Sequence, residues 1–209
     1  FKKSKENFEK ALPFLKDAGS LNELANYQNN LANFYKKNQL HDLALPLYEK
    51  GASYHLSIKD YRSYYLTLIN YSNCFLELDD ITRAQSILNR IQQKYLLKIK
   101  DLRILAEYYN LKGNILLKSK KNNNKDSIGY FFKTSFNIVK KLESNETLEH
   151  FDDYIRYLSS VNDTLKLKEE FKRIAIDSIY NHGSLFDKTS FLKTLEILKK
   201  NDFTKDLLV

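Results

Sequence analysis

A pattern of small and large residues recurs along this chain, and that repetition restricts the possible folds more than any other feature. A small residue is followed four places later by a large one at Ala44 and Tyr48, and again at Ala84 and Leu88. The equivalent first positions are 4, 44, 84, 127 and 167, so the successive steps are 40, 40, 43 and 40 residues. A fixed period of this length indicates a repeat protein, in which each repeat is one supersecondary unit.

The length of the repeat points to a pair of helices. About forty residues hold two helices of roughly 16 residues and two tight turns, at a rise of about 1.5 Å per residue. The chain of 209 residues contains only 5 Gly and 2 Pro, which is too little turn chemistry to join many short strands. A small residue in the second helix lets the facing helix approach, and the large residue one turn later fills the gap. We therefore predict an all-α fold of antiparallel helix hairpins.

The period also places the boundaries of helices and repeats. Ser20 with Glu23 forms a capping box, and Asp60, Asp101 and Asn145 stand where later helices should start. The sequence begins in what resembles the middle of a helix and contains no Met, so we interpret it as a piece of a longer protein. The expected boundaries lie near residues 19, 39, 59, 79, 99, 122, 144, 162 and 183. We expect one domain over residues 1–209, with repeat units 1–18, 19–58, 59–98, 99–143 and 144–182 and a C-terminal helix at 185–209.

Several residues are expected to pack in the core. Ala44 and Ala84 should be buried at helix crossings, because a larger side chain would force the neighbouring helices apart. Pro46 should lie in the first turn of its helix, with Asp42 as the cap, where its missing N–H is not needed. The single cysteine, Cys74, precedes an aromatic residue in a first helix and is interpreted as a packed, inert thiol. The large residues expected in the core are Tyr35, Tyr48, Phe75, Phe131 and Phe171.

Residues 24–57 carry the clearest outline of a known repeat. A large, a small and an aromatic residue in the first helix are followed by a small, an aromatic and a small residue in the second, namely Leu31, Ala32, Tyr35, Ala44, Tyr48 and Gly51. This outline resembles the tetratricopeptide repeat, although Gln28 departs from its usual aromatic residue and Ala32 from its glycine. The resemblance covers roughly residues 1–181. It implies a right-handed superhelical stack, an α-solenoid with a period of about 40 residues.

The lengthened period resembles the long-repeat variety of this family that occurs in bacterial signalling proteins. These include sensor domains that precede histidine kinases, as in two-component systems, or DNA-binding output domains, and receptors for secreted peptide pheromones share the architecture. The resemblance therefore implies protein or peptide binding within signal transduction. No kinase motif or DNA-binding helix-turn-helix can be separated from the repeats, so we expect any output domain to lie outside this segment.

The composition argues against several other classes of function. The formal net charge is +8, but 34 basic and 26 acidic residues are interleaved, which is typical of a solvated surface and favours no nucleic acid. No apolar run approaches the roughly 18 residues that a membrane span needs. We expect no catalytic residues, no cofactor and no metal, because the histidines lack His or Cys neighbours at ligand spacing. The four histidines are His41, His55, His150 and His182.

Asparagines recur at one place of the first helices when the repeats are superimposed. Asn33, Asn73 and Asn114 share this place, and Asn29 and Asn110 lie one turn earlier on the same face. In the tetratricopeptide family such positions line the inner groove of the superhelix. An amide offers a donor and an acceptor, so a row of amides can pair with the backbone of an extended peptide. The predicted partner-binding groove comprises Asn26, Asn29, Asn33, Asn73, Asn110, Asn114, Asp152 and Arg156, and the last two end the row with charge.

The recurring asparagines also have an explanation without a binding function: the chain is rich in Asn, and asparagine is tolerated on helix surfaces. If the groove is real, its asparagines should be accessible on one concave surface and should contribute little to stability. The leading hypothesis for function is a protein- or peptide-binding sensor domain of a bacterial signalling regulator. The alternatives are an assembly scaffold without a switching role, a pheromone receptor, and a nucleic-acid-associated repeat, which the scattered Lys and Arg disfavour. A homodimer is compatible with each, and the compartment is left open.

Overall fold

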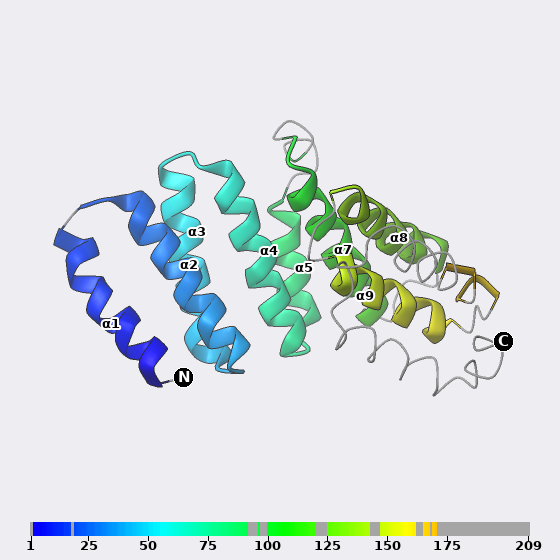
Figure 1. The fold of residues 1–209 in the computed structure, drawn as a ribbon, viewed down its shortest axis with the longest axis horizontal. Helices are drawn as coiled ribbons and strands as arrows, with labels where there is room; N and C mark the ends of the chain where they lie inside the picture. The colour runs from blue at the N-terminus through cyan, green and yellow to red at the C-terminus, as the bar shows by residue number, and fades with distance from the viewer. Residues whose placement is uncertain are drawn as a thin grey trace. The chain divides into compact units, whose positions relative to one another are not determined.

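The computed structural model describes residues 2–17, 19–91, 96, 100–119, 125–142, 147–161, 165–167 and 169–170, and no strand occurs among them (Figure 1). The helices are α1 (Lys2–Asp17), α2 (Leu21–Lys37), α3 (His41–Ser57), α4 (Tyr61–Glu77), α5 (Ile81–Asn89), α7 (Leu102–Lys118), α8 (Lys125–Lys141) and α9 (Thr147–Ser160). The predicted all-α class is confirmed. The chain forms two compact units, Phe1–Ile104 and Leu105–Val209, which are described separately. The single superhelical stack over residues 1–209 stays a prediction.

The helix boundaries follow the predicted spacing. The positions predicted near 19, 39, 59, 79, 122 and 144 each fall between two consecutive helices. The boundary predicted near 99 lies just before α7, the one near 162 lies just after α9, and the one near 183 is outside the described residues. Helices α2, α3 and α4 have 17 residues each. A helix of this length and its short turn together make half of the predicted repeat.

The turns of the first unit share one backbone conformation. Gln39, Lys59 and Asp79 follow the ends of α2, α3 and α4, with φ of 60°, 60° and 61°. In each turn the next N–H reaches back five residues: Leu40 to the Tyr35 carbonyl, Asp60 to His55 and Asp80 to Phe75, all at 2.9 Å. This is the Schellman motif, which closes a helix through one left-handed residue. The motif therefore recurs at a fixed interval along the chain.

Aspartate side chains open α4, α5 and α7, whereas α3 has no side-chain cap. Asp60 accepts a hydrogen bond from the Ser63 N–H at 3.0 Å, and Asp80 accepts one from the Arg83 N–H at 2.9 Å. Asp101 likewise accepts from the backbone at the start of α7. The predicted starts at Asp60 and Asp101 are confirmed, as is the Ser20 cap, whose hydroxyl accepts from the Glu23 N–H at 3.3 Å. Asn145 lies outside the described residues.

Pro46 does not lie in the first turn of α3, so that prediction was wrong. Leu40, and not Asp42, is the N-cap, and the helix already begins at His41. The Schellman turn causes this early start, because it places the Leu40 carbonyl to accept from the Leu43 and Ala44 N–H groups, each at 3.1 Å. Pro46 therefore lies inside the helix, where it removes one backbone donor.

Close helix packing in the first unit relies on the predicted small residues. Ala44, Ala84 and Tyr48 are fully buried, as predicted, and Phe75 is buried as well. Helix α3 packs on both α2 and α4. A Cβ added at Gly51 would lie 3.4 Å from the Ala25 carbonyl oxygen of α2, at the edge of ordinary van der Waals contact, so the two helices lie close together here.

Cys74 and Tyr35 were also predicted to pack inside this unit. Cys74 is buried, and burial raises its pKa to about 11, which confirms a packed thiol. Tyr35 is half-buried and not a core residue, because it lies in the last turn of α2 at the Schellman motif.

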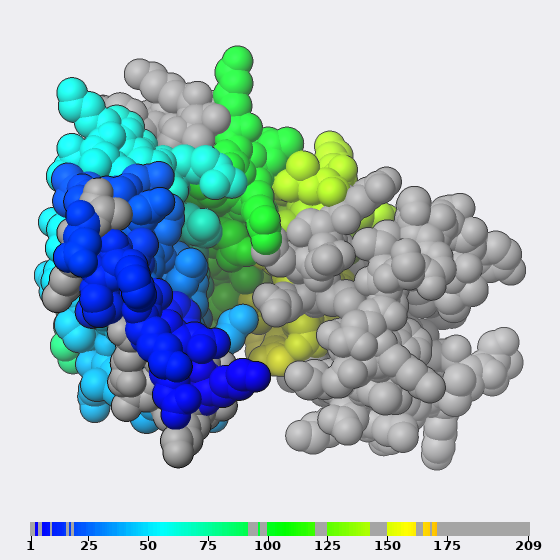
Figure 2. All heavy atoms as spheres, turned by 60° about the vertical axis from the view of Figure 1, so that its left-hand side comes forward, coloured from blue at the N-terminus to red at the C-terminus, as the bar shows by residue number. Residues whose placement is uncertain are grey.

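Helix α1 forms the end of the first unit and packs on α2 (Figures 1 and 2). The Tyr27 hydroxyl donates to the Phe8 carbonyl at 3.0 Å. The Phe8 ring lies between aromatic neighbours, with centroids 5.8 Å from Tyr27 and 5.6 Å from Phe34. The first unit thus continues its helix-on-helix packing to α1.

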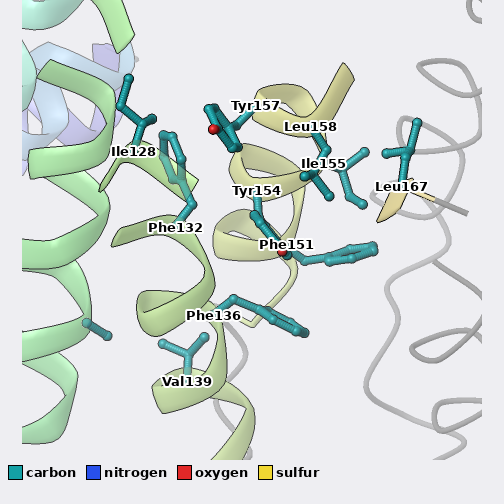
Figure 3. Packing of buried hydrophobic residues seen from close by; sticks show 11 residues of the cluster. Ile128, Phe132, Phe136, Val139, Phe151, Tyr154, Ile155, Tyr157, Leu158 and Leu167 are labelled. Atoms are coloured by element: carbon teal, nitrogen blue, oxygen red, sulfur yellow. The ribbon is translucent and has the colours of Figure 1, made fainter. Parts of the chain in front are cut away.

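An aromatic core fills the second unit. Gly113 allows α7 to approach α8, since a Cβ there would lie 3.0 Å from Cε1 of the Phe132 ring. Ala106 of α7 is also buried in this core. Figure 3 shows side chains of α8 and α9 facing one another; they include Ile128, Phe132, Phe136, Phe151, Tyr154 and Leu158.

The core residue of α8 is Phe132 and not the predicted Phe131. Phe132 is fully buried, whereas Phe131 is half-buried and stacks on Tyr109 with ring centroids 6.0 Å apart. Lys112 Nζ lies 4.6 Å from the Phe131 centroid, in the position of a cation–π contact. Repeat spacing alone had assigned the inward face of α8 one residue too early. Phe171, also predicted for the core, lies outside the described residues.

Replacing Ala44 by Leu is expected to lower the free energy of unfolding by about 1–3 kcal/mol, because the larger side chain must displace a neighbouring helix. Urea denaturation followed by circular dichroism measures the change. Ser53→Leu is the matched control, since Ser53 is exposed on the same helix. The control should shift the free energy by less than about 0.5 kcal/mol. Equal midpoints for Ala44→Leu and the wild type would contradict the packing.

Replacing Lys59 by Gly is expected to stabilise the first unit by about 0.5–1 kcal/mol. A left-handed residue with a Cβ costs roughly 1–2 kcal/mol, and the greater freedom of Gly in the unfolded chain cancels part of the gain. Lys59→Ala keeps the strained conformation and serves as the control. Thermal unfolding in which both variants shift the midpoint equally would argue against the left-handed turn.

Candidate peptide-binding faces

Helix α2 presents three of the predicted asparagines on one face. Asn26, Asn29 and Asn33 are three and four residues apart, so they lie one above another along the helix. Asn26 is exposed, and its Nδ2 donates weakly to Asn22 Oδ1 at 3.5 Å. Asn29 and Asn33 are half-buried. Asn26 therefore has the predicted accessibility, whereas Asn29 and Asn33 have it only in part.

Asn29 holds a side-chain oxygen without a hydrogen-bond partner. Its Oδ1 has almost no exposed surface and meets no donor among the described residues. A buried acceptor left in this state costs about 1–3 kcal/mol. Because the residue as a whole is only half-buried, rotation of the side chain can turn the amide outward. Asn29 is therefore placed to gain from a ligand that brings a donor to this face.

Asn33 has a structural role that the sequence did not indicate. Its Oδ1 accepts a hydrogen bond from the Tyr48 hydroxyl at 2.7 Å. Tyr48 is fully buried on α3, and burial, with smaller contributions from Cys74 and Glu77, raises the pKa of its hydroxyl far above the usual range. The hydroxyl thus stays protonated and needs an acceptor. The expectation that stability barely depends on Asn33 is not supported by this contact.

Helix α4 continues the face beside α2. Asn73 is half-buried, and its side chain forms no hydrogen bond with another described residue. One turn after Asn73, Glu77 accepts from Lys36 Nζ at 3.1 Å and contacts His41 Nε2 at 2.8 Å. Lys36 lies one turn after Asn33, so this ion pair brings the ends of the α2 and α4 faces together. The earlier place on α4 is taken by Ile69, which is buried.

The second unit carries the other predicted amides on α7. Asn110 Nδ2 and Asn114 Nδ2 both donate to Asp153 Oδ2 of α9, at 2.8 and 3.3 Å. Asp153 was not among the predicted residues. The Asp-Asp doublet in the sequence was a signal for it, but repeat spacing selected the preceding residue, Asp152. Asp152 instead pairs with Arg156 on its own helix, at 2.7 Å.

Asn110 shares the unusual feature of Asn29. Its Oδ1 is buried and has no hydrogen-bond partner in the described part of the chain. The assignment of oxygen and nitrogen is fixed here, because the Asp153 carboxylate can only accept and must face the NH₂ group. Asn29 and Asn110 occupy equivalent places in their repeats. Gln28 Oε1 and Thr67 Oγ1 of the first unit are also buried without a partner among the described residues, but Asn29 and Asn110 are the pair that recurs at equivalent places. A single groove through both units stays a prediction.

A Ser135–His150–Glu107 cluster begins on the α7 face at the half-buried Glu107 and continues inward to the buried Ser135 and His150. Ser135 Oγ lies 2.5 Å from His150 Nδ1, and His150 Nε2 lies 3.2 Å from Glu107 Oε1. The order of side chains is that of a nucleophile, a base and an acid. However, the Ser135 hydroxyl is buried and donates to the Ala106 carbonyl at 2.7 Å. We therefore interpret the cluster as a connection among α7, α8 and α9.

Comparison with known proteins does not assign the chain to a family. No family profile matches it, and no curated protein was found to be a significant relative. Within the described residues, no group of three His, Cys, Asp or Glu side chains is arranged to hold a metal ion. None of the described helices combines the length and hydrophobicity of a bilayer span. The tetratricopeptide resemblance therefore continues to rest on the spacing in the sequence.

Asn33→Ala is expected to lower the free energy of unfolding by about 1–3 kcal/mol, because it leaves the buried Tyr48 hydroxyl without an acceptor. Adding Tyr48→Phe should recover part of this loss, since the double variant has no buried hydroxyl to satisfy. A double-mutant cycle in urea measures the coupling. Strictly additive losses would show that the hydrogen bond contributes nothing.

Proposed function

We propose that this chain is a protein- or peptide-binding module, built from tetratricopeptide-like hairpins, that binds an extended segment along the first-helix faces. On the first unit the binding face comprises Asn26 and Asn29 of α2 and Asn73 of α4. The repeat spacing, the all-helical fold and the half-buried amides support this proposal. On the second unit, Asn110 and Asn114 mark the corresponding face of α7.

The observation that carries the proposal is the buried oxygen at Asn29, which is repeated at Asn110. Proteins satisfy nearly all of their buried polar atoms, so an unpaired acceptor calls for an explanation. A backbone N–H of a bound peptide supplies the missing donor, and the amide nitrogen then faces a peptide carbonyl. Recurrence at equivalent places argues against an isolated packing fault.

The charges beside the amides give the bound segment a direction. Asn73 and Asn33 each lie one turn before the Lys36–Glu77 ion pair, whose atoms are 3.1 Å apart. Both side chains of this pair are partly exposed, so either can exchange its partner for a charge on the ligand. Exposed ion pairs are worth only about 0–1 kcal/mol, and such an exchange therefore costs little.

The biological setting we propose is a sensing domain of a bacterial signalling regulator, with a histidine kinase or transcriptional regulator as its output. This setting rests on the long-repeat resemblance. An assembly scaffold or a receptor for peptide pheromones would use the same faces, and no contact described above favours either over the sensor.

The proposed binding is tested with a random peptide library displayed to the whole chain, followed by fluorescence anisotropy on the selected peptides. The combined change Asn29→Ala and Asn73→Ala should weaken binding by roughly tenfold or more, which corresponds to about 1.4 kcal/mol. Asn33 is left intact because it accepts from Tyr48. Methylating backbone nitrogens of the peptide should weaken binding more than replacing its side chains by Ala.

Asn30→Ala is the matched control, because Asn30 is exposed beside Asn29 but points about 100° away around the helix. It should bind the selected peptides like the wild type. The proposal fails if no peptide is selected, or if the Asn29 and Asn73 changes leave the affinity unaltered.

A further inference from the structure

A five-residue pattern occurs twice in the first unit, and the proposed function makes no use of it. Residues 58–62 read Ile-Lys-Asp-Tyr-Arg, and residues 99–103 read Ile-Lys-Asp-Leu-Arg. Each copy spans the start of the first helix of a repeat. Lys59 and Lys100 have left-handed φ of 60° and 54°, and the aspartate after each of them caps α4 or α7. The turn between α3 and α4 lies at the upper ends of these helices in Figure 1.

The lysine and the arginine of this pattern are not needed to form the junction between helices. Between α4 and α5, Asp79 forms the left-handed turn and Asp80 the cap, with Thr82 at the place of the arginine. Gln39 takes the left-handed place after α2. The junction therefore does not explain why the cations recur where a second helix is followed by a first helix.

An ion pair joins the two copies of the pattern. Arg62 Nε donates to Asp101 Oδ2 at 2.6 Å, and this contact places the start of α4 beside the start of α7. The first residues of these helices, Tyr61 and Leu102, are both 48% exposed. Leu56, in the last turn of α3, is also exposed. The copies thus bring three exposed apolar side chains to one edge of the unit.

Cations outnumber carboxylates at this edge. Asp60 and Asp101 cap their helices and are turned toward backbone N–H groups, so their side chains are only 33% and 17% exposed. The exposed cations beside them are Lys59, Arg62, Lys100 and Arg103. Solvent therefore meets ammonium and guanidinium groups next to apolar side chains. We call residues 56–62 and 100–103 the basic edge.

The charge and the apolar side chains together define a partner. Cations select a partner of opposite charge, but exposed ion pairs are individually weak, so apolar contact must contribute to the affinity. About half of each apolar side chain is covered by its own unit, which offers a shallow surface to a protein segment rather than side chains that insert into a bilayer. We propose that the basic edge binds an acidic segment of a partner protein, with apolar residues next to its carboxylates. This site does not use the asparagines.

A displayed library of helical peptides tests this on the whole chain, with one peptide face randomised among Asp, Glu, Lys, Leu and Phe. The selected peptides should combine Asp or Glu with Leu or Phe, and added salt should weaken them in fluorescence anisotropy. Lys59→Gln with Lys100→Gln should weaken them by roughly tenfold or more. Glutamine suits the left-handed place, since Gln39 adopts it. Tyr61→Ser with Leu102→Ser should also weaken them, because the apolar contact is lost.

Lys37→Gln with Lys50→Gln is the matched control, because Lys37 ends α2 at the opposite ends of the helices and Lys50 is exposed within α3. It should bind the selected peptides like the wild type. An equal loss in the control would reduce the effect to net charge and overturn the site. Circular dichroism melting separates any loss from unfolding.

Three other outcomes overturn the proposal. The first is selection of basic or uncharged peptides. The second is that no selected peptide depends on Lys59 and Lys100; if the peptides depend instead on Asn29 and Asn73, the peptide-binding proposal survives alone. The third is binding to phosphatidylserine vesicles that is lost with Lys59→Gln and Lys100→Gln, which would assign the edge to a lipid surface.

Discussion

The arrangement of the first unit depends on single residues that end one helix and begin the next. The backbone N–H of Asp60 closes α3 by donating to the His55 carbonyl, and its carboxylate opens α4 by accepting from Ser63. In the same way, the Asp80 N–H closes α4 by donating to the Phe75 carbonyl, and the Asp80 carboxylate opens α5 by accepting from Arg83. No flexible linker is left between such helices, so the angle of each hairpin is set by a few backbone torsions. Burial at Ala44 and Ala84 can recur only because this junction recurs.

Much of this arrangement was predictable from the sequence. The spacing of small and large residues predicted the helix boundaries, since a helix tolerates only certain lengths between identical junctions. It also predicted burial at Ala44, Ala84, Tyr48 and Phe75. Propensity did not predict the junction itself, because Gln39, Lys59 and Asp79 adopt a conformation that usually favours Gly. The backbone bonds of the Schellman motif outweigh that preference.

Errors of one residue account for most of what the sequence could not predict. A step of one residue rotates a helix position by about 100°, which separates a buried place from an exposed one. Phe131 was expected inward, but the gap beside Gly113 accepts Phe132. Asp152 was expected at the groove position equivalent to the asparagines, but Asp153 is the residue that contacts the amides of α7. Both residues lie after the longer third step of the repeat. The spacing of the earlier repeats therefore could not predict which residues of the later helices face inward.

The two units use the same asparagine places in different ways, and this difference decides where a peptide has access. On α7 the places are tied to α9, because Asn110 and Asn114 donate to Asp153. Glu107, which corresponds to Asn26, contacts His150 of α9 at 3.2 Å. On α2, Asn33 is committed to Tyr48, but Asn26 is exposed and Asn29 lacks a partner for its oxygen. On α7 a peptide can pair with the Asn110 oxygen, but it must break the contacts with Asp153 to use the amide nitrogens of Asn110 and Asn114. On α2 the exposed amide of Asn26 adds to the unpaired oxygen of Asn29. The α2 face is therefore the stronger candidate for the first contact with a partner.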